Sequence, residues 1–401
     1  MFKNTINGYL QKLFCKIIKL GTIVFACMIL VLSGIAHAEC NPQFKKVVDG
    51  GFGDRFNIYI WSLKTFGDYL YATTLNQKSG GEIWRFDGTS WELVISGGFG
   101  KIENQGVRSL EIFNDILYAG LENIELGAEI WRSHDGINWE CVMQEGFGNP
   151  DNVSVRGMAV FHNYLYVGTQ NINGTGQIWR SENGSDWLPV VLDGFGDTGN
   201  SSMHAMDVYH GFLYVGTRNV VVGTQIWRSF NGQKFYPVVG PTGFIESGFG
   251  KGDGETYHIA HISEVSMFVG TGNWKSGFGV YQSSGGLHFN QVGRKGFGDR
   301  TNAYAWRFHI YEQELWFGAM NKSIGTKGGS IWRFKDGREE MVGGNGIYAG
   351  YGFDNLSNWG IRSFETFQGK LYIGTAQCWV EGCDPYVSGA EIWEWPGKSC
   401  P

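Results

Sequence analysis

A Gly-Phe-Gly triplet recurs along the chain at intervals of about 48 residues and restricts it to a repeat architecture. An apolar–aromatic pair, an Ile-Trp pair and a Gly-containing turn follow each triplet in the same order, with Val280-Tyr281 replacing Ile-Trp in the fifth repeat. The triplets begin at Gly51, Gly98, Gly146, Gly194, Gly248 and Gly296, with the variant Gly352-Phe353-Asp354 as the seventh. Each repeat therefore predicts four short strands, because no helical periodicity separates its apolar segments.

Seven four-stranded units of this length are typical of a β-propeller. The composition agrees, since 62 of 401 residues are Gly and 15% are aromatic, as expected for many tight turns around a large core. The predicted fold is all-β: one seven-bladed β-propeller domain over residues 39–401. Residues 44–48 match the fourth strand of a repeat, whereas the seventh repeat stops after its third strand at Ile392-Trp393. We therefore expect a 3+1 closure, in which the N-terminal strand completes the last blade.

The first 38 residues have the pattern of an export signal. Lysines from Lys3 to Lys19 precede an apolar run over residues 21–32, and Ala36 and Ala38 fit a signal-peptidase site. The alternative is an uncleaved anchor, but a dozen apolar residues are short for a membrane span. We predict cleavage after Ala38 and a secreted or periplasmic mature protein without stable membrane insertion.

Five cysteines remain after that cleavage, and an exported protein can form disulfides. The predicted repeat register brings Cys40 and Cys400 to the same turn, and Cys378 and Cys383 share one loop. We expect Cys40–Cys400 and Cys378–Cys383 disulfides, with Cys141 left as a buried free thiol.

Two predicted turns, Ser133–Trp139 and Ser181–Trp187, contain Ser, Asp or Asn, Gly and Trp in a common order. They resemble the Asp-box (BNR) hairpin of sialidase-like propellers, although one residue is missing between the Asp and the Trp. Residues 86–91 and 229–235 are weaker copies. The resemblance implies the fold and a structural turn on the outside of the blade, and it implies no catalytic residue.

Aligning the repeats on Gly-Phe-Gly gives two informative columns. Four residues after the triplet stand Asn57, Asn104, Asn152, Asn200, Asn302 and Asn358, with Gly254 in the fifth repeat. We interpret them as Asx turns that satisfy local backbone donors, the alternative being a ring of ligand-binding amides. Eight residues after the triplet stand Trp61, Arg108, Arg156, His204, His258, Trp306 and Arg362. These side chains either line the central funnel as a ligand site or pack between blades as paired structural residues.

Loop insertions point to the same region. Connections are longer at residues 240–247, 322–329, 338–351 and 378–386, and the predicted geometry places all four on one face. The last contains Trp379 and Tyr386 between or beside the paired cysteines, which is typical of a binding loop.

Several functional classes find no support in the sequence. The net charge of −6 and the lack of a Lys/Arg run argue against a nucleic-acid partner. No HExxH or CxxC motif, phosphate-binding loop, dinucleotide fingerprint or nucleophile elbow is present, so we predict no metal and no cofactor.

We predict a non-enzymatic protein that binds an extracellular glycan, an anionic small molecule or a protein. The alternative is a glycoside hydrolase or lyase of sialidase-like type acting on acidic carbohydrate. There Arg108, Arg156 and Arg362 would hold a carboxylate. Tyr59, Tyr304 or Tyr257 near Glu255 would imitate the nucleophile pair. The sequence lacks the Arg-Ile-Pro segment of sialidases, and those enzymes have six blades.

Overall fold

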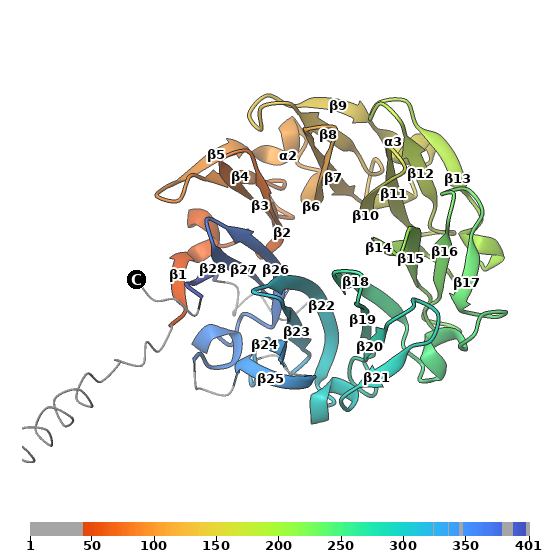
Figure 1. The fold of residues 1–401 in the computed structure, drawn as a ribbon. Coiled ribbons are helices and arrows are strands. Elements are labelled where there is room, and N and C mark those ends of the chain that lie inside the picture. The colour runs from red at the N-terminus through yellow and green to blue at the C-terminus, as the bar shows by residue number, and fades with distance from the viewer. Residues whose placement is uncertain (1–42, 324, 336, 345–347, 379–387, 398–401) are drawn as a thin grey trace, which may run out of the picture. The chain divides into compact units, whose positions relative to one another are not determined.

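The computed structural model describes residues 43–323, 325–335, 337–344, 348–378 and 388–397. These residues form one body, Gln43–Gly397, built from a 28-stranded antiparallel sheet. Figure 1 shows consecutive strands running outward from a common axis in successive meanders. Within the described ranges, no helical segment has the length and apolar character needed to cross a membrane.

The strands fall into four classes by distance from the axis. The innermost strands are β2 (Tyr59–Phe66), β6 (Asn104–Phe113), β10 (Asn152–Phe161), β14 (Ser202–Tyr209), β18 (Glu255–Ile262), β22 (Asn302–Tyr311) and β26 (Gly360–Phe367). The second strands are β3 (Tyr69–Leu75), β7 (Ile116–Asn123), β11 (Tyr164–Asn171), β15 (Phe212–Arg218), β19 (Ser266–Gly272), β23 (Glu314–Asn321) and β27 (Lys370–Ala376). The third strands are β4 (Ile83–Phe86), β8 (Ile130–Ser133), β12 (Ile178–Ser181), β16 (Ile226–Ser229), β20 (Val280–Ser283), β24 (Ser330–Lys335) and β28 (Ile392–Trp395). The outermost strands are β5 (Trp91–Ile95), β9 (Glu140–Met143), β13 (Leu188–Val191), β17 (Tyr236–Val239), β21 (Asn290–Val292), β25 (Arg338–Gly343) and β1 (Lys45–Val48).

The ring is continuous through its two ends. Each innermost strand contacts its neighbour on either side, and β26 contacts β2. The N-terminal strand β1 pairs antiparallel with β28, with Lys46 opposite Trp393 and Val48 opposite Ile392. Strands from opposite ends of the sequence therefore lie side by side in one meander (Figure 1).

The Gly-Phe-Gly triplets form single-turn helical segments between meanders. These segments are η1 (Gly50–Gly53), α2 (Gly97–Gly100), α3 (Glu145–Gly148), η2 (Gly194–Gly196), η3 (Ser247–Gly250), η4 (Lys295–Gly298) and η5 (Tyr351–Asp354). The phenylalanine of every triplet has a positive φ, between 50° and 62°, which is unfavourable for a side chain with a β-carbon. In six repeats its ring stacks on the aromatic residue of the third strand at centroid distances between 3.8 and 4.6 Å. In the sixth repeat Phe297 meets Trp332 edge to face instead.

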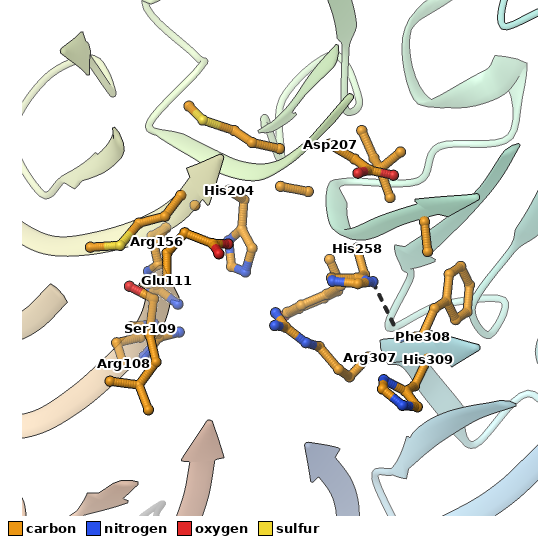
Figure 2. Close-up of a pocket in the computed structure, with 18 of the residues that line it drawn as sticks. Arg108, Ser109, Glu111, Arg156, His204, Asp207, His258, Arg307, Phe308 and His309 are labelled. Carbon is orange, nitrogen blue, oxygen red and sulfur yellow. Dashed lines mark hydrogen bonds between the residues drawn. The ribbon is translucent and has the colours of Figure 1, made fainter. Parts of the chain in front are cut away.

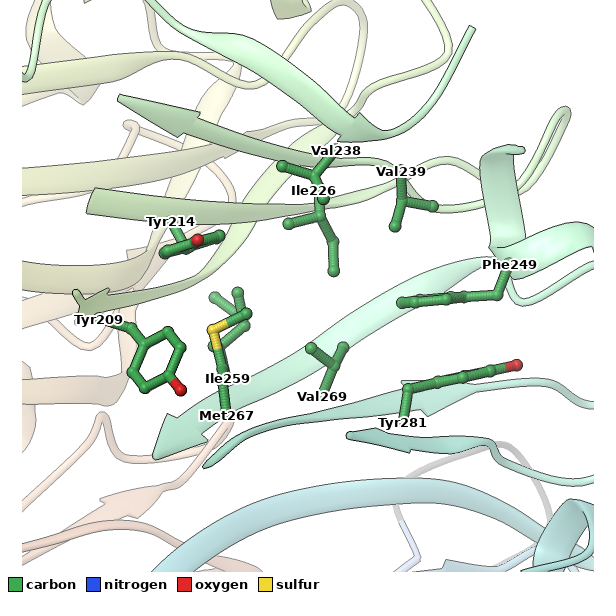
Figure 3. Packing of buried hydrophobic residues seen from close by; sticks show 11 residues of the cluster. Tyr209, Tyr214, Ile226, Val238, Val239, Phe249, Ile259, Met267, Val269 and Tyr281 are labelled. Carbon is green, nitrogen blue, oxygen red and sulfur yellow. The ribbon is translucent and has the colours of Figure 1, made fainter. Parts of the chain in front are cut away.

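The hydrophobic core is divided into clusters between neighbouring meanders. Figure 3 shows the cluster between the fourth and fifth repeats, where Tyr214 and Ile226 of one face Ile259 and Val269 of the other. Both apolar faces of a sheet are buried only when the sheet is covered on both sides. Each meander therefore depends on its two neighbours to bury its apolar side chains.

Cys141 corrects one expectation. It lies on the outermost strand β9 and is exposed, not buried. The outermost strand pairs only with β8, so its side chains have less cover than those of the inner strands. Of the cysteines expected to form disulfides, only Cys378 lies among the described residues, where it is buried.

Candidate functional site

The asparagine column is structural. Each asparagine side chain donates a hydrogen bond of 2.8–3.0 Å to the carbonyl of the first triplet glycine, six residues earlier. Asn57 also donates to Glu82 at 2.7 Å, and Glu82 accepts the indole N–H of Trp84 at 2.7 Å. All six asparagines are buried and locked in such networks. Their role is to satisfy a backbone carbonyl, whereas Asx turns would have satisfied backbone donors.

The connection between the triplet and the innermost strand is one residue shorter in the fifth repeat than in the others, which shifts the alignment of that strand. Asp253 follows Gly248 by five residues instead of six and takes the asparagine position, accepting from Asn273 at 3.0 Å and from Tyr281 at 2.7 Å. The equivalent of the funnel column in this repeat is therefore Tyr257, and His258 is the next residue along. The apparent exception at Gly254 has the same cause.

The corrected column occupies a β-bulge on every innermost strand. The register with the second strand shifts at Trp61, Arg108, Arg156, His204, Tyr257, Trp306 and Arg362. A bulge leaves one residue outside the ladder and redirects its side chain. All of these residues line one or both of two cavities along the axis.

The first cavity, here named the aromatic cavity, has a volume of about 380 Å³. Its aromatic lining consists of Tyr59, Trp61, Tyr257, Trp274, Tyr304, Trp306 and Trp359. Its charged lining consists of Arg108, Arg156, Arg218, Arg362, Glu122 and Glu255. Ile124, Ile172 and Trp274, which line the cavity from connections between second and third strands, are about half exposed.

The second cavity, here named the histidine cavity, has a volume of about 280 Å³. Figure 2 shows Arg307, His258 and His204 directed into it from neighbouring strands. Its titratable lining also includes His261, His309, Asp207, Glu111 and the column arginines Arg108, Arg156 and Arg362. Trp61, Arg108, Arg156, Tyr257 and Arg362 line both cavities, so part of the column lies between them.

Two tryptophans and two arginines of the column form equivalent pairs. The Arg108 guanidinium lies over the Trp61 ring at 4.3 Å, and that of Arg362 lies over Trp306 at 5.1 Å. Each indole lies against a glycine of the next innermost strand, and a β-carbon at Gly106 or Gly360 would collide with it.

The two pairs differ in what neutralises the arginine. Arg108 donates to Glu122 at 2.9 Å, and Arg156 donates to Gln170; each partner stands fourteen residues later on the second strand. The same spacing from Arg362 leads to Ala376, which pairs with Gly360 as Glu122 pairs with Gly106. Among the described residues Arg362 has no hydrogen-bond or ion-pair partner, and burial together with Arg108 and Arg307 lowers its pKa to about 9.

His204, Glu255 and Arg218 form a connected group, in which Glu255 and Arg218 line the aromatic cavity and His204 lines the histidine cavity. His204 Nδ1 lies 2.7 Å from Glu255 Oε1, and Arg218 Nε lies 3.5 Å from Glu255 Oε2. Burial lowers the pKa of His204 despite the neighbouring carboxylate. Burial and the Glu255 charge hold the pKa of Tyr257 well above its usual value, so the phenol stays protonated.

The structure brings the residues of the predicted column together around the axis. Other expected site residues lie outside the part of the chain that the structure describes. Trp379 and Tyr386 lie outside the described residues, as do Cys40, Cys383 and Cys400. Cys378, which precedes that loop, packs in the same hydrophobic cluster as Trp61 and Trp306. Sequence reasoning missed Arg307, the place of Tyr257 in the column and the unpaired state of Arg362. The connection after the fifth triplet, which is one residue short, was the readable signal for Tyr257.

The turns that resemble Asp boxes make only structural contacts. Ser133 Oγ accepts the Gly136 N–H at 2.8 Å, and Asp135 accepts the N–H groups of Ile137 and Asn138. None of these residues lines either axial cavity. Across the ranges that the structure describes, no group of three His, Cys, Asp or Glu residues is arranged to hold a metal ion.

Comparison with known proteins gives the fold. No family model and no curated protein matches the chain. The WD40 β-propeller domain of Doa1 aligns with a TM-score of 0.52 at 8% identity, covering 88% of this chain and 96% of that one. The β-propeller domain of the Trilobed protease from Pyrococcus furiosus, described as having an open velcro topology, aligns with a TM-score of 0.50 at 10% identity, covering 85% and 96%. The chain has a β-propeller fold. At these identities the likeness extends to the fold alone.

Proposed function

We propose that this protein is a non-enzymatic binding protein that holds an anionic small molecule with a ring face, such as an acidic sugar, in the aromatic cavity. The observation that carries the proposal is Arg362. It is a buried cation over the Trp306 ring, and an alanine stands where Arg108 has its glutamate. A buried charge without a counterion is costly, so a carboxylate on a ligand would complete the site.

The aromatic walls of the cavity suit the ring of such a ligand. Aromatic walls that hold fixed polar groups are typical of small-molecule pockets, and a volume of about 380 Å³ is in their range. The predicted binding loop with Trp379 and Tyr386 follows Cys378, which belongs to this aromatic cluster. We propose that the loop contributes to ligand binding.

A hydrolase or lyase remains the second candidate because Glu255 and Tyr257 line the same cavity as the arginines. Two observations make binding the better proposal. The raised pKa of Tyr257 disfavours a phenolate nucleophile, and Glu255 is already engaged by His204 and Arg218. The only carboxylates that line this cavity from the described part of the chain are Glu122 and Glu255.

We further propose that the propeller has seven blades with a 3+1 closure, supported by the antiparallel pairing of β1 with β28. We propose that residues 39–401 form one domain and that the mature protein acts in the periplasm or outside the cell. The basic and apolar pattern of residues 1–38, with Ala36 and Ala38 at its end, supports this localisation. We also propose the two disulfides Cys40–Cys400 and Cys378–Cys383, and a relationship to Asp-box propellers supported by the turn at Ser133–Gly136.

The binding proposal is tested with the mature protein on an array of acidic, sulfated and neutral glycans, with mass detection of any product. We expect retention of acidic members without turnover. Ala376→Glu would give Arg362 the partner that Arg108 has, and we expect affinity to fall about ten- to a hundredfold. If that variant melts at a lower temperature, Arg362→Gln replaces it.

Arg85→Met is the matched control, because Arg85 lies over Tyr69 at 4.4 Å on the outer side of a meander. It should bind like the wild type. Equal retention of neutral and acidic glycans, or unchanged affinity in both cavity variants, would refute the proposal. Accumulation of a cleaved product would favour the enzyme.

A further inference from the structure

The residue that follows the bulge is small in most repeats and large in two. It is Ser62, Ser109, Gly157, Ala205 or Ser363 in five repeats, and His258 and Arg307 in the fifth and sixth. The serines have a structural role, since Ser363 Oγ donates to the Ile60 carbonyl of the next repeat at 2.8 Å. Two large polar side chains on the neighbouring strands β18 and β22 depart from this pattern.

Arg307 lies in the histidine cavity without a direct counterion. Figure 2 shows its side chain reaching between His258 and His204. Among the described residues it has no hydrogen-bond or ion-pair partner, and the two carboxylates that line the cavity are held elsewhere. Glu111 accepts from Lys64 at 2.9 Å, and Asp207 lies 2.8 Å from His261 Nδ1.

His258 supplies a second donor to the same space. Its Nδ1 accepts the Phe308 backbone N–H at 3.2 Å, so the proton of the neutral ring is on Nε2. Burial and the adjacent Arg307 hold the pKa of His258 well below its usual value, which keeps the ring neutral. Within the described ranges Nε2 has no acceptor, although it faces a polar cavity.

We infer that the histidine cavity binds a small oxyanion, such as phosphate, sulfate or a free carboxylate, between the Arg307 guanidinium and the His258 Nε2–H. An arginine fork beside an N–H donor is suited to two oxygens of one anion. The site is distinct from the proposed ligand site, because Arg307 and His258 line the histidine cavity and not the aromatic cavity.

Calorimetric titration of the mature protein with phosphate, sulfate and acetate in chloride-free buffer tests the inference and separates tetrahedral from planar anions. We expect saturable binding of at least one of them. Arg307→Met should weaken it about ten- to a hundredfold, and His258→Leu should weaken it about tenfold. Bound anion should also raise the pKa of His258, observed by NMR of the imidazole, because a negative charge favours the protonated ring.

Two control variants outside the histidine cavity test whether the anion binds in that cavity. Arg228→Met removes an arginine that lies over Phe212 on an outer strand, and Trp274→Ala alters only the aromatic cavity; both should titrate like the wild type. Failure of glycan binding would leave this titration unchanged, so the two proposals are tested separately. If Arg307→Met does not fold, Arg307→Lys keeps the charge without the fork and should bind severalfold more weakly. Absence of saturable binding to all three anions, or wild-type affinity in the folded Arg307 variant, would overturn the inference.

Discussion

Single residues around the axis differ mainly in how their charge is compensated. Arg108 and Arg362 occupy the same bulge position and lie over equivalent tryptophans. Arg108 has a carboxylate partner, whereas an alanine stands at the equivalent position for Arg362. A buried pair mostly offsets its own desolvation, whereas a buried lone cation does not. We propose that this contrast, more than the presence of arginine, separates a residue that binds a ligand from a structural one.

Glu365 on β26 provides a residue-scale prediction about pH. Burial raises the pKa of this carboxyl from 4.5 to about 7, with Lys64 opposing the shift. A raised folded-state pKa means that the folded protein holds a proton that the unfolded chain has released between these values. The free energy of unfolding should therefore fall as the pH rises from about 4.5 to about 7, by at most about 3 kcal/mol.

Urea unfolding at pH 5 and pH 8 checks this expectation. In Glu365→Gln the side chain carries no titrating proton, so the contribution of this residue to the pH dependence should disappear. The variant should gain stability relative to wild type at pH 8 and little at pH 5. An equal pH dependence in the two proteins would contradict the prediction.

At the scale of elements, the phenylalanine of the triplet turn has an unfavourable positive φ, and its ring makes a favourable aromatic stack. Phe147 has a φ of 62°, and its ring stacks on Trp179 at 4.6 Å. We expect Phe147→Ala to cost about 2 kcal/mol, since it loses the stack and keeps the strained backbone. Phe147→Gly loses the same contact but adopts the left-handed conformation freely, so it should be more stable than the alanine variant by about 0.5–1 kcal/mol.

Denaturant unfolding followed by tryptophan fluorescence measures both variants. Phe230→Ala is a suitable control because Phe230 is 54% exposed on a turn. Its stability should change by a few tenths of a kcal/mol. If the alanine variant proved as stable as the glycine variant, the backbone would carry no strain at this position.

At the scale of the whole molecule, the pairing of β1 with β28 joins the two ends of the described body. Val48 on β1 pairs with Ile392, and Val191 on β13 pairs with Ile178 at the equivalent place inside the chain. If the terminal strand is as integral to the ring as an internal one, Val48→Ala and Val191→Ala should each cost about 2 kcal/mol. A cost of only a few tenths at Val48, measured by the same unfolding experiment, would show that β1 is a detachable tail.

The regular part of the fold was predictable because it is encoded locally. The pair Leu117-Tyr118 falls in β7 and Ile130-Trp131 in β8, as the repeat pattern predicts, because alternation and turn residues act over a few positions. The error at His258 arose from counting a fixed number of residues after the triplet. Asp253 marked the true register, since a carboxylate can replace the acceptor of the asparagine position.

The repeat therefore specified by itself an all-β chain, the order of its strands and the positions that bulge toward the axis. Only the tertiary structure decided which of the arginines around the axis has a carboxylate partner. A carboxylate partner for Arg362 would have to come from the second strand of its own meander. A partner for Arg307 would have to come from side chains of several other meanders. Burial and Coulomb interactions act across space between residues that are distant in sequence, so only the folded ring distinguishes the paired arginines from those left free to bind a ligand.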